Sequence, residues 1–167
     1  MAVKQNNCAI CAGTFDPPSF GHINIIERAL KVFDCITIAI ALDNAKGCLF
    51  SFEERKAVFS EIFKDEPRVK IDSFRGLLVE YARQKGINVL VRGIRTVADY
   101  EYELQMSLAN RMLNSNIETI FIMTEGRYSH ISSSIVKQII KLGGSGRDMI
   151  HPCVEEKLKE KLFPKSK

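Results

Sequence analysis

Several short segments of the sequence contain residue types that bind phosphate. Residues 13–22 hold two glycines and two prolines together with Thr14 and His22. Backbone N–H groups at the start of a helix attract anions, glycine permits close backbone approach, and a hydroxyl or imidazole adds a side-chain donor. This pattern indicates a phosphate-binding loop, although a capped loop with a solvent-facing histidine would share it. The segment is neither a Walker A loop nor a Gly-x-Gly-x-x-Gly turn.

Three further segments offer cations or hydroxyl groups. Lys46 lies in the polar stretch 43–47, Arg92 and Arg95 flank a glycine, and three consecutive serines occupy positions 132–134. Arginine binds phosphate through a planar fork, and three serines at a helix start exceed what capping requires. A single loop lysine or histidine is more often only solvated, so these residues gain meaning if the fold brings them together.

The alternation of apolar patterns predicts an α/β fold. The strands are expected at residues 8–13, 35–42, 69–74, 88–91 and 117–123, and the helices at 22–33, 51–63, 77–85, 97–113, 132–142 and about 152–163. Such alternation is typical of a single Rossmann-like domain over residues 1–167, with a five-stranded parallel sheet, helices on both faces and the C-terminal helix packed on it. Ligands of this architecture bind at the carboxyl ends of the strands.

Cationic or hydroxyl side chains follow four of these five strands. Because the carboxyl ends of parallel strands share one edge of the sheet, we expect the side chains to converge there. The edge would then hold several negative charges, which indicates nucleotide or phosphate-ester chemistry carried out by positioning and charge neutralisation. Neither a Ser-His-Asp set nor a Cys/His metal pattern is evident.

Composition excludes several other classes of protein. With 167 residues, 46% hydrophobic and 26% charged, the chain can bury a core, so disorder is excluded. The net charge is +4, of which residues 155–167 contribute +2, and no basic face for nucleic acid is indicated. The longest largely apolar run, residues 35–42, is too short for a membrane span, and the polar N-terminus lacks a signal peptide, so we expect a cytoplasmic protein.

The five cysteines do not suggest a disulfide framework. Cys8 and Cys11 form a Cys-x-x-Cys pattern, but they lie in an expected strand, where positions three apart point to opposite faces. We therefore expect both to be buried thiols.

Four motifs together resemble the bacterial phosphopantetheine adenylyltransferase family, within the nucleotidyltransferase superfamily. The Gly-His and Ile-Ser-Ser-Ser motifs are shared across the superfamily, whereas the arginine and tyrosine-rich stretch is specific to this enzyme family. The likeness runs from about residue 8 to about residue 162. The motifs are Gly-Thr-Phe-Asp-Pro at 13–17, Gly-His at 21–22, Arg-Gly-Ile-Arg at 92–95 with Asp-Tyr-Glu-Tyr-Glu at 99–103, and Ile-Ser-Ser-Ser at 131–134.

The resemblance implies a reaction and its participants. 4'-Phosphopantetheine attacks the α-phosphate of ATP, which yields dephospho-coenzyme A and pyrophosphate in coenzyme A biosynthesis. The family implies Mg²⁺, a homohexamer and no covalent intermediate.

The resemblance also implies roles for individual residues. His22 stabilises the transition state and contacts ATP, and Thr14 contacts both substrates. The phosphopantetheine site includes Lys46, Leu78 and Arg92, although the pattern alone favours a core position for Leu78. The remaining ATP contacts are Phe15, Gly93, Ile94, Arg95, Glu103, Tyr128, Ser129, His130, Ile131, Ser132, Ser133 and Ser134.

Two departures from the family pattern affect the local contacts. Ser19 stands where threonine or histidine is usual, and Tyr128 stands where tryptophan is common. The alternatives are a related enzyme that uses nicotinate mononucleotide, or CTP with a phospho-alcohol, and a nucleotide-binding regulator without catalysis.

Overall fold

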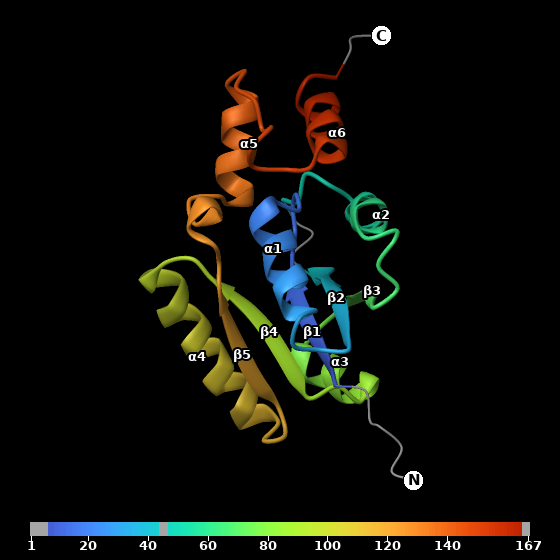
Figure 1. Cartoon of the computed structure of the whole chain (residues 1–167), viewed down its shortest axis with the longest axis vertical. Coiled ribbons are helices and arrows are strands. Elements are labelled where there is room, and N and C mark those ends of the chain that lie inside the picture. Colours follow the sequence, from blue (N-terminus) through green and yellow to red (C-terminus); the bar gives the residue numbers. More distant parts are fainter. Residues whose placement is uncertain (1–6, 44–46, 165–167) are drawn as a thin grey trace.

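A five-stranded parallel sheet forms the centre of the computed structural model, which describes residues 7–43 and 47–164 (Figure 1). Its strand order is β3-β2-β1-β4-β5. This result confirms the α/β, Rossmann-like prediction, including its number of strands and their parallel pairing. The strands are β1 (Cys8–Gly13), β2 (Cys35–Ala41), β3 (Val69–Phe74), β4 (Val89–Ile94) and β5 (Glu118–Met123).

The sheet opens between β1 and β4, where the strand order reverses. β1 pairs with β2 along its whole length, from Cys8↔Cys35 to Gly13↔Ile40. Against β4 it pairs only at Ile10↔Leu90 and Cys11↔Val91. The carboxyl ends of β1 and β4 are therefore not joined by ladder hydrogen bonds, and this reversal is where open α/β sheets bind ligands.

Alternate residues of β1 enter two different cores, one on each face of the sheet. Ala9 and Cys11 pack in a cluster with α1 (Phe20–Ala29) and α2 (Phe52–Ile62). Ile10 and Ala12 pack in a cluster with α3 (Leu78–Lys85). α4 (Val97–Leu113) lies along β4 and β5, and its Glu103 bonds Arg92 of β4. Helices therefore cover both faces, as predicted.

A third core lies beyond the carboxyl ends of the strands, where α5 (Ser133–Lys141) and α6 (Pro152–Leu162) sit in Figure 1. Val136 and Ile140 of α5 and Leu158 of α6 pack there with Val58 of α2. The C-terminal helix thus packs against other helices rather than on the sheet.

Local signals set several element boundaries. Ser51 and Glu54 form a capping box, since the Ser51 hydroxyl accepts from the Glu54 N–H and the Glu54 carboxylate accepts from the Ser51 N–H. α3 ends at Gly86, which adopts a left-handed φ of 65°. The largest boundary differences are in α1 and β4. α1 begins at Phe20 rather than 22, because Ser19 is its N-cap, and ends at Ala29 rather than 33. β4 continues to Ile94 rather than 91, because its pairing with β5 continues. The 3₁₀ turn η2 (Gly126–Tyr128) was not predicted.

The surface of α4 is unusually apolar. Leu104 and Leu108 are exposed, and the side chain of Met112 is 88% exposed; Glu103 is the buried residue of this helix. Exposed apolar surface of this extent is typical of an interaction site. Within residues 7–43 and 47–164, none of the helices combines the length and apolarity that a bilayer span requires.

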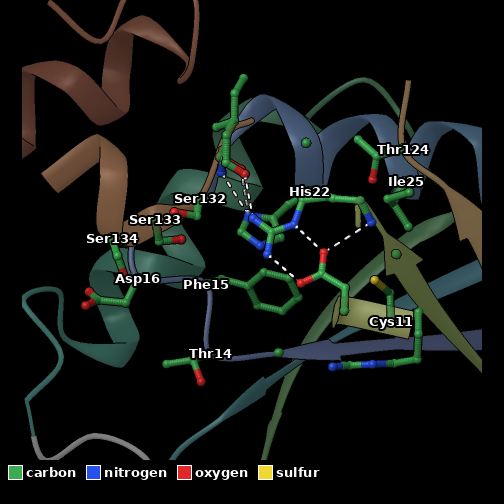
Figure 2. Close-up of a pocket in the computed structure, with 18 of the residues that line it drawn as sticks. Cys11, Thr14, Phe15, Asp16, His22, Ile25, Thr124, Ser132, Ser133 and Ser134 are labelled. Carbon is green, nitrogen blue, oxygen red and sulfur yellow. Dashed lines mark hydrogen bonds and ion pairs between the residues drawn. The ribbon is translucent and has the colours of Figure 1, made fainter. Parts of the chain in front are cut away.

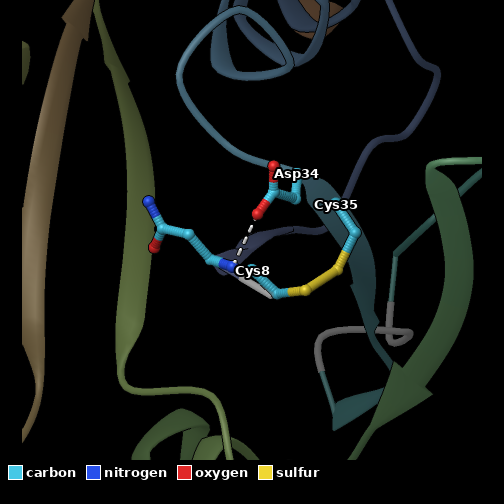
Figure 3. The surroundings of a disulfide bond; sticks show 4 residues. Cys8, Asp34 and Cys35 are labelled. Atoms are coloured by element: carbon cyan, nitrogen blue, oxygen red, sulfur yellow. Dashed lines mark hydrogen bonds between the residues drawn. A yellow bond between two sulfur atoms is a disulfide. The ribbon is translucent and has the colours of Figure 1, made fainter. Parts of the chain in front are cut away.

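Cys8 and Cys35 form a disulfide between the first residues of β1 and β2, so the expectation of a Cys8 thiol is wrong (Figure 3). The two residues are direct partners in the parallel register, with their Cα atoms 4.6 Å apart. The Asn7 N–H donates to the Asp34 carboxylate beside them, at 3.0 Å. Cys11 is buried on the other side of β1, as expected from strand alternation.

The disulfide predicts a thiol count and a stability difference. Unfolded protein prepared without reductant should show three reactive thiols and, after reduction, five, because Cys11, Cys48 and Cys153 lie outside the disulfide. The bond closes a segment with a sequence separation of 27, so Cys35→Ser should lower the free energy of unfolding by about 3 kcal/mol under oxidising conditions. The same substitution should have little effect in excess reductant, and five thiols without reduction would refute the bond.

Candidate active site

A cleft of about 520 Å³ opens at the carboxyl ends of β1 and β4, where the sheet divides (Figure 2). Its walls come from the loop after β1, the start of α1, the end of β4, the first turns of α4 and the start of α5. Segments far apart in the sequence thus share one cavity, as the topology predicts.

The structure brings most of the predicted site residues into this cleft. The lining residues among them are Thr14, Phe15, His22, Arg92, Gly93, Arg95, Glu103, Ile131, Ser132, Ser133 and Ser134. Lys46 lies outside the described residues.

Five predicted site residues do not line the cleft. Leu78 packs beside the core under α3, which agrees with the core interpretation of its pattern. Ile94 is buried. Tyr128 turns away in the 3₁₀ turn and packs against Phe20, with ring centroids 6.2 Å apart. The other two, Ser129 and His130, follow this turn and also lie off the cleft wall.

The loop after β1 is shaped by Phe15, whose φ of 53° lies in the left-handed region. Its ring is buried and meets the rings of His22 and Phe59 edge to face, with centroids 5.1 and 5.0 Å away. A Cβ atom at Gly13 would lie 2.9 Å from the Phe15 ring, so only glycine fits there. The backbone of this loop is therefore set by aromatic packing beneath it.

His22 is held in one tautomer by the backbone. Its Nδ1 accepts a hydrogen bond from the Ser19 N–H at 3.0 Å, and the Ser19 hydroxyl lies at the same distance. Because a backbone N–H can only donate, Nδ1 carries no proton and the neutral ring carries its proton on Nε2. His22 therefore offers one Nε2–H donor, and its side chain lines the cleft (Figure 2).

The charge state of His22 follows from its surroundings. Burial lowers its pKa to about 4, and the nearby positive charges of Arg95 and Arg92 act in the same direction. The imidazole is therefore neutral near pH 7. It can donate a hydrogen bond to a phosphate oxygen without adding a positive charge.

Each cleft arginine is bound by a carboxylate from α4. Nε of Arg92 donates to Glu103 at 2.7 Å, and Nε of Arg95 donates to Asp99 at 2.9 Å. A second nitrogen of each guanidinium bonds the same carboxylate. Sequence reasoning did not predict that these side chains form ion pairs, although Glu103 was expected in the site.

The third nitrogen of each guanidinium is bound by a backbone carbonyl. Arg92 Nη1 donates to Ala12 O at the end of β1. Arg95 Nη1 donates to Ile131 O at 2.8 Å and so connects α4 to the start of α5. A guanidinium has five N–H groups, so after these three bonds two N–H groups of each arginine have no partner among the described residues.

Sequence reasoning missed a third ion pair, between Asp16 and Lys137. Asp16 is buried and accepts from Lys137 Nζ at 2.8 Å and from the Leu49 and Phe50 N–H groups. Burial alone would raise the pKa of Asp16, but Lys137 and the two backbone donors outweigh it and hold that pKa below its ordinary value. The carboxylate joins the β1 loop, the segment before α2 and α5 in one network.

The three serines after Ile131 have different partners. Ser132 is the N-cap of α5 and accepts from the Ile135 N–H at 3.2 Å. The Ser133 hydroxyl donates to Pro17 O at 2.8 Å and so ties α5 to the β1 loop. Ser134 lies beside them on the cleft wall (Figure 2). One serine therefore caps the helix and one fixes the loop.

Cys11 also lines the cleft, but its thiol is protonated. Burial is the main cause that raises the pKa of Cys11 to about 11; the charge of Arg92 opposes this and that of Glu103 adds to it. A thiol that holds its proton at neutral pH is a poor nucleophile. The cleft therefore offers positioned hydrogen-bond donors and cations rather than a cysteine nucleophile.

The depressed pKa of His22 predicts how stability depends on pH. The unfolded chain takes up a proton at this residue near pH 6.5 and the folded chain near pH 4, so the unfolded state binds more protons in between. Stability should therefore fall as the pH drops from 6.5 to 4, by about 3 kcal/mol from this group. Urea unfolding of the wild type and of His22→Asn across this range measures the difference.

Between pH 6.5 and 4, His22→Asn should lose about 3 kcal/mol less stability than the wild type. Parallel curves for the wild type and His22→Asn would contradict the depressed pKa.

Comparisons with known proteins agree with this geometry. Residues 10–139 match the cytidylyltransferase-like family. A solved structure from Vibrio parahaemolyticus, described as a candidate nicotinate-nucleotide adenylyltransferase, superposes with a TM-score of 0.66 at 18% sequence identity. The superposition covers 97% of this chain and 98% of that one and shows that the two share a fold. Since the family match runs from β1 into α5 and includes both walls of the cleft, the chain belongs to the cytidylyltransferase-like family of nucleotidyltransferases.

Proposed function

We propose that this nucleotidyltransferase transfers the adenylyl group of ATP to 4'-phosphopantetheine, with dephospho-coenzyme A and pyrophosphate as products. One observation carries the proposal. A neutral His22 with an Nε2–H donor lines the same cleft as Arg92 and Arg95, at the carboxyl ends of β1 and β4. This arrangement suits a reaction in which two anions must approach one another.

The chemistry follows from the charges of the reactants. A phosphate oxygen of the acceptor attacks the α-phosphorus of ATP, a new P–O bond forms, the bond between the α- and β-phosphates breaks, and its electron pair leaves with pyrophosphate. Because the attacking phosphate is already ionised, no general base is needed. The protein has to position the two reactants and offset their repulsion.

The cleft residues have distinct parts in this scheme. His22 donates from Nε2 to an oxygen of the α-phosphate, where negative charge builds up. Arg92, with Lys46 as the resemblance implies, holds the acceptor phosphate. Arg95 and the start of α5 hold the triphosphate, since N–H groups at a helix N-terminus attract anions.

Specific features favour each acceptor. The Arg-Gly-Ile-Arg motif followed by Asp-Tyr-Glu-Tyr-Glu favours 4'-phosphopantetheine, because that stretch is the most specific part of the resemblance. The structural likeness favours nicotinate mononucleotide as the second candidate. The family match makes CTP with a phospho-alcohol the third.

We propose that Mg²⁺ enters with the nucleotide. Each acidic side chain on the described cleft wall, Asp16, Asp99 and Glu103, is already bound to a lysine or arginine. In the part of the chain that the structure describes, no three His, Cys, Asp or Glu side chains cluster as metal ligands. Mg²⁺ commonly binds substrate phosphates and water with few protein ligands, and there it would neutralise phosphate charge.

Assembly into a homohexamer and a cytoplasmic location are proposed on the same resemblance. The exposed apolar residues of α4 provide a surface that self-association would cover. A disulfide is uncommon in a cytosolic protein, so the Cys8–Cys35 bond also bears on the proposed location. Counting the thiols of protein isolated from a reducing compartment tests whether the bond forms there.

An assay with separate acceptors tests the proposal. With ATP and Mg²⁺, pyrophosphate release should require 4'-phosphopantetheine, because the acceptor phosphate supplies the attacking oxygen. Parallel reactions contain nicotinate mononucleotide, or CTP with a phospho-alcohol. Turnover with one of those pairs and none with 4'-phosphopantetheine would reject the proposed acceptor, and nucleotide binding without turnover would indicate a regulator.

A substitution tests the part assigned to His22. His22→Ala should lower kcat at least ~100-fold while ATP binding persists, because the lost donor acts mainly on charge that develops in the transition state. Steady-state kinetics and calorimetric ATP titration measure the two effects. His151→Asn serves as the control histidine variant, and a kcat for His22→Ala near that of the wild type would remove His22 from this part.

A further inference from the structure

Arg55 of α2 is a buried guanidinium that is not part of the cleft wall. It is 1% exposed and is the largest, by residue volume, of the fully buried side chains. Arginine is rarely buried without a partner because removing its charge from water is costly. Its partners are therefore informative.

Among the described residues, the hydrogen-bond partners of Arg55 are backbone carbonyl groups. Nη1 donates to Thr14 O at 2.7 Å and to Ala41 O at 3.3 Å, and Nε donates to Ser51 O at 3.2 Å. Thr14 follows β1, Ala41 ends β2 and Ser51 caps α2. One side chain thus fastens the carboxyl ends of two adjacent strands to the start of a helix.

The charge of Arg55 differs from that of the other cations in this region. Arg92, Arg95 and Lys137 on the cleft wall each bind a carboxylate, so those three cations and the three carboxylates balance. Among the described residues, no carboxylate lies within 4 Å of the Arg55 nitrogens. Arg55 therefore gives the region one net positive charge from behind the wall.

We propose that Arg55 is a positioning residue for adenylyl transfer, acting through the backbone of the loops after β1 and β2. Thr14 is the expected contact of both substrates, and Gly47 and Cys48 of the second loop also line the cleft. Because Arg55 binds the carbonyl groups where both loops begin, it sets the spacing of the two loops at the cleft. This inference rests on the proposed nucleotidyl-transfer function.

A lysine cannot reproduce this arrangement. Its ammonium group is a single point donor on a flexible stem, whereas the guanidinium holds its donors in a rigid plane. Arg55→Lys keeps the charge while it loses the fixed three-carbonyl geometry, so it separates positioning from charge. Arg55→Gln removes the charge and serves as the second variant.

Arg68→Lys controls for the same substitution at a half-exposed arginine that also pairs with Glu66. Arg68 also donates to a backbone carbonyl, from Nη1 to Leu30 O at 2.9 Å, but it precedes β3 at the opposite edge of the sheet. A general effect of replacing a carbonyl-binding arginine should appear equally in both variants.

The experiment measures kinetics and amide exchange for the wild type and these variants. For Arg55→Lys we expect kcat to fall at least ~10-fold with the Kd for ATP within ~threefold of wild type, because small displacements of reacting groups affect the reaction more than binding. The Leu49 and Phe50 N–H groups belong to the second loop and donate to Asp16 in the first. We also expect these two amides to exchange at least ~10-fold faster in Arg55→Lys than in the wild type. Arg68→Lys should change neither.

The outcomes separate this inference from the proposed function. If the wild type turns over none of the acceptors, the proposed function fails, and faster exchange confined to the two loops still decides whether Arg55 positions them. Unchanged kcat and exchange in Arg55→Lys would overturn the inference. Loss of folding in both Arg55 variants, seen by circular dichroism, would also overturn it, because Arg55 would then serve the stability of the whole domain.

Discussion

Charge compensation inside the cleft is the constraint on which the rest of the site depends. A cavity that binds polyanions needs cations, but unpaired cations so close together would repel one another in the empty protein. The chain solves this by supplying Glu103 and Asp99 from α4 and Asp16 from the β1 loop. Each carboxylate holds its cation in a fixed orientation and leaves part of its donor set open. The arginines of the cleft are therefore already oriented, and little reorganisation would be required for an anion to bind.

The neutral state of His22 belongs to the same arrangement. Burial is the main reason that its pKa falls, and the two arginines add to that effect, so the cations that would attract phosphate also keep the imidazole uncharged. The Ser19 N–H completes the effect by fixing the tautomer. Positive charge and hydrogen-bond donation are thereby divided between different residues. This division explains how a histidine at a helix start contributes to the site without increasing the repulsion between cations.

The sequence was sufficient for the pattern of elements because each depends on local chemistry: strand alternation in β1, the Ser51 cap and the glycine after α3 are all short-range signals. It was also sufficient for the convergence of Thr14, His22 and the arginines, since the parallel topology dictates which loops meet. It failed where partners are distant. The Asp16–Lys137 pair spans 121 positions, and the Cys8–Cys35 bond depends on strand register that no local pattern specifies. Tyr128 was misplaced for a related reason: a 3₁₀ turn redirects it toward α1.

The loop after β1 shows how packing maintains a shape that the backbone alone disfavours. A left-handed residue other than glycine costs on the order of 1 kcal/mol, and Phe15 accepts this cost at the edge of the cleft. Its buried ring, held between His22 and Phe59, contributes more than that through apolar burial. The same ring contacts the imidazole, and Arg55 binds the carbonyl group of the preceding residue. The aromatic core and the buried guanidinium thus act on adjacent residues, so the position of the loop after β1 is fixed from beneath by the packing of the protein itself.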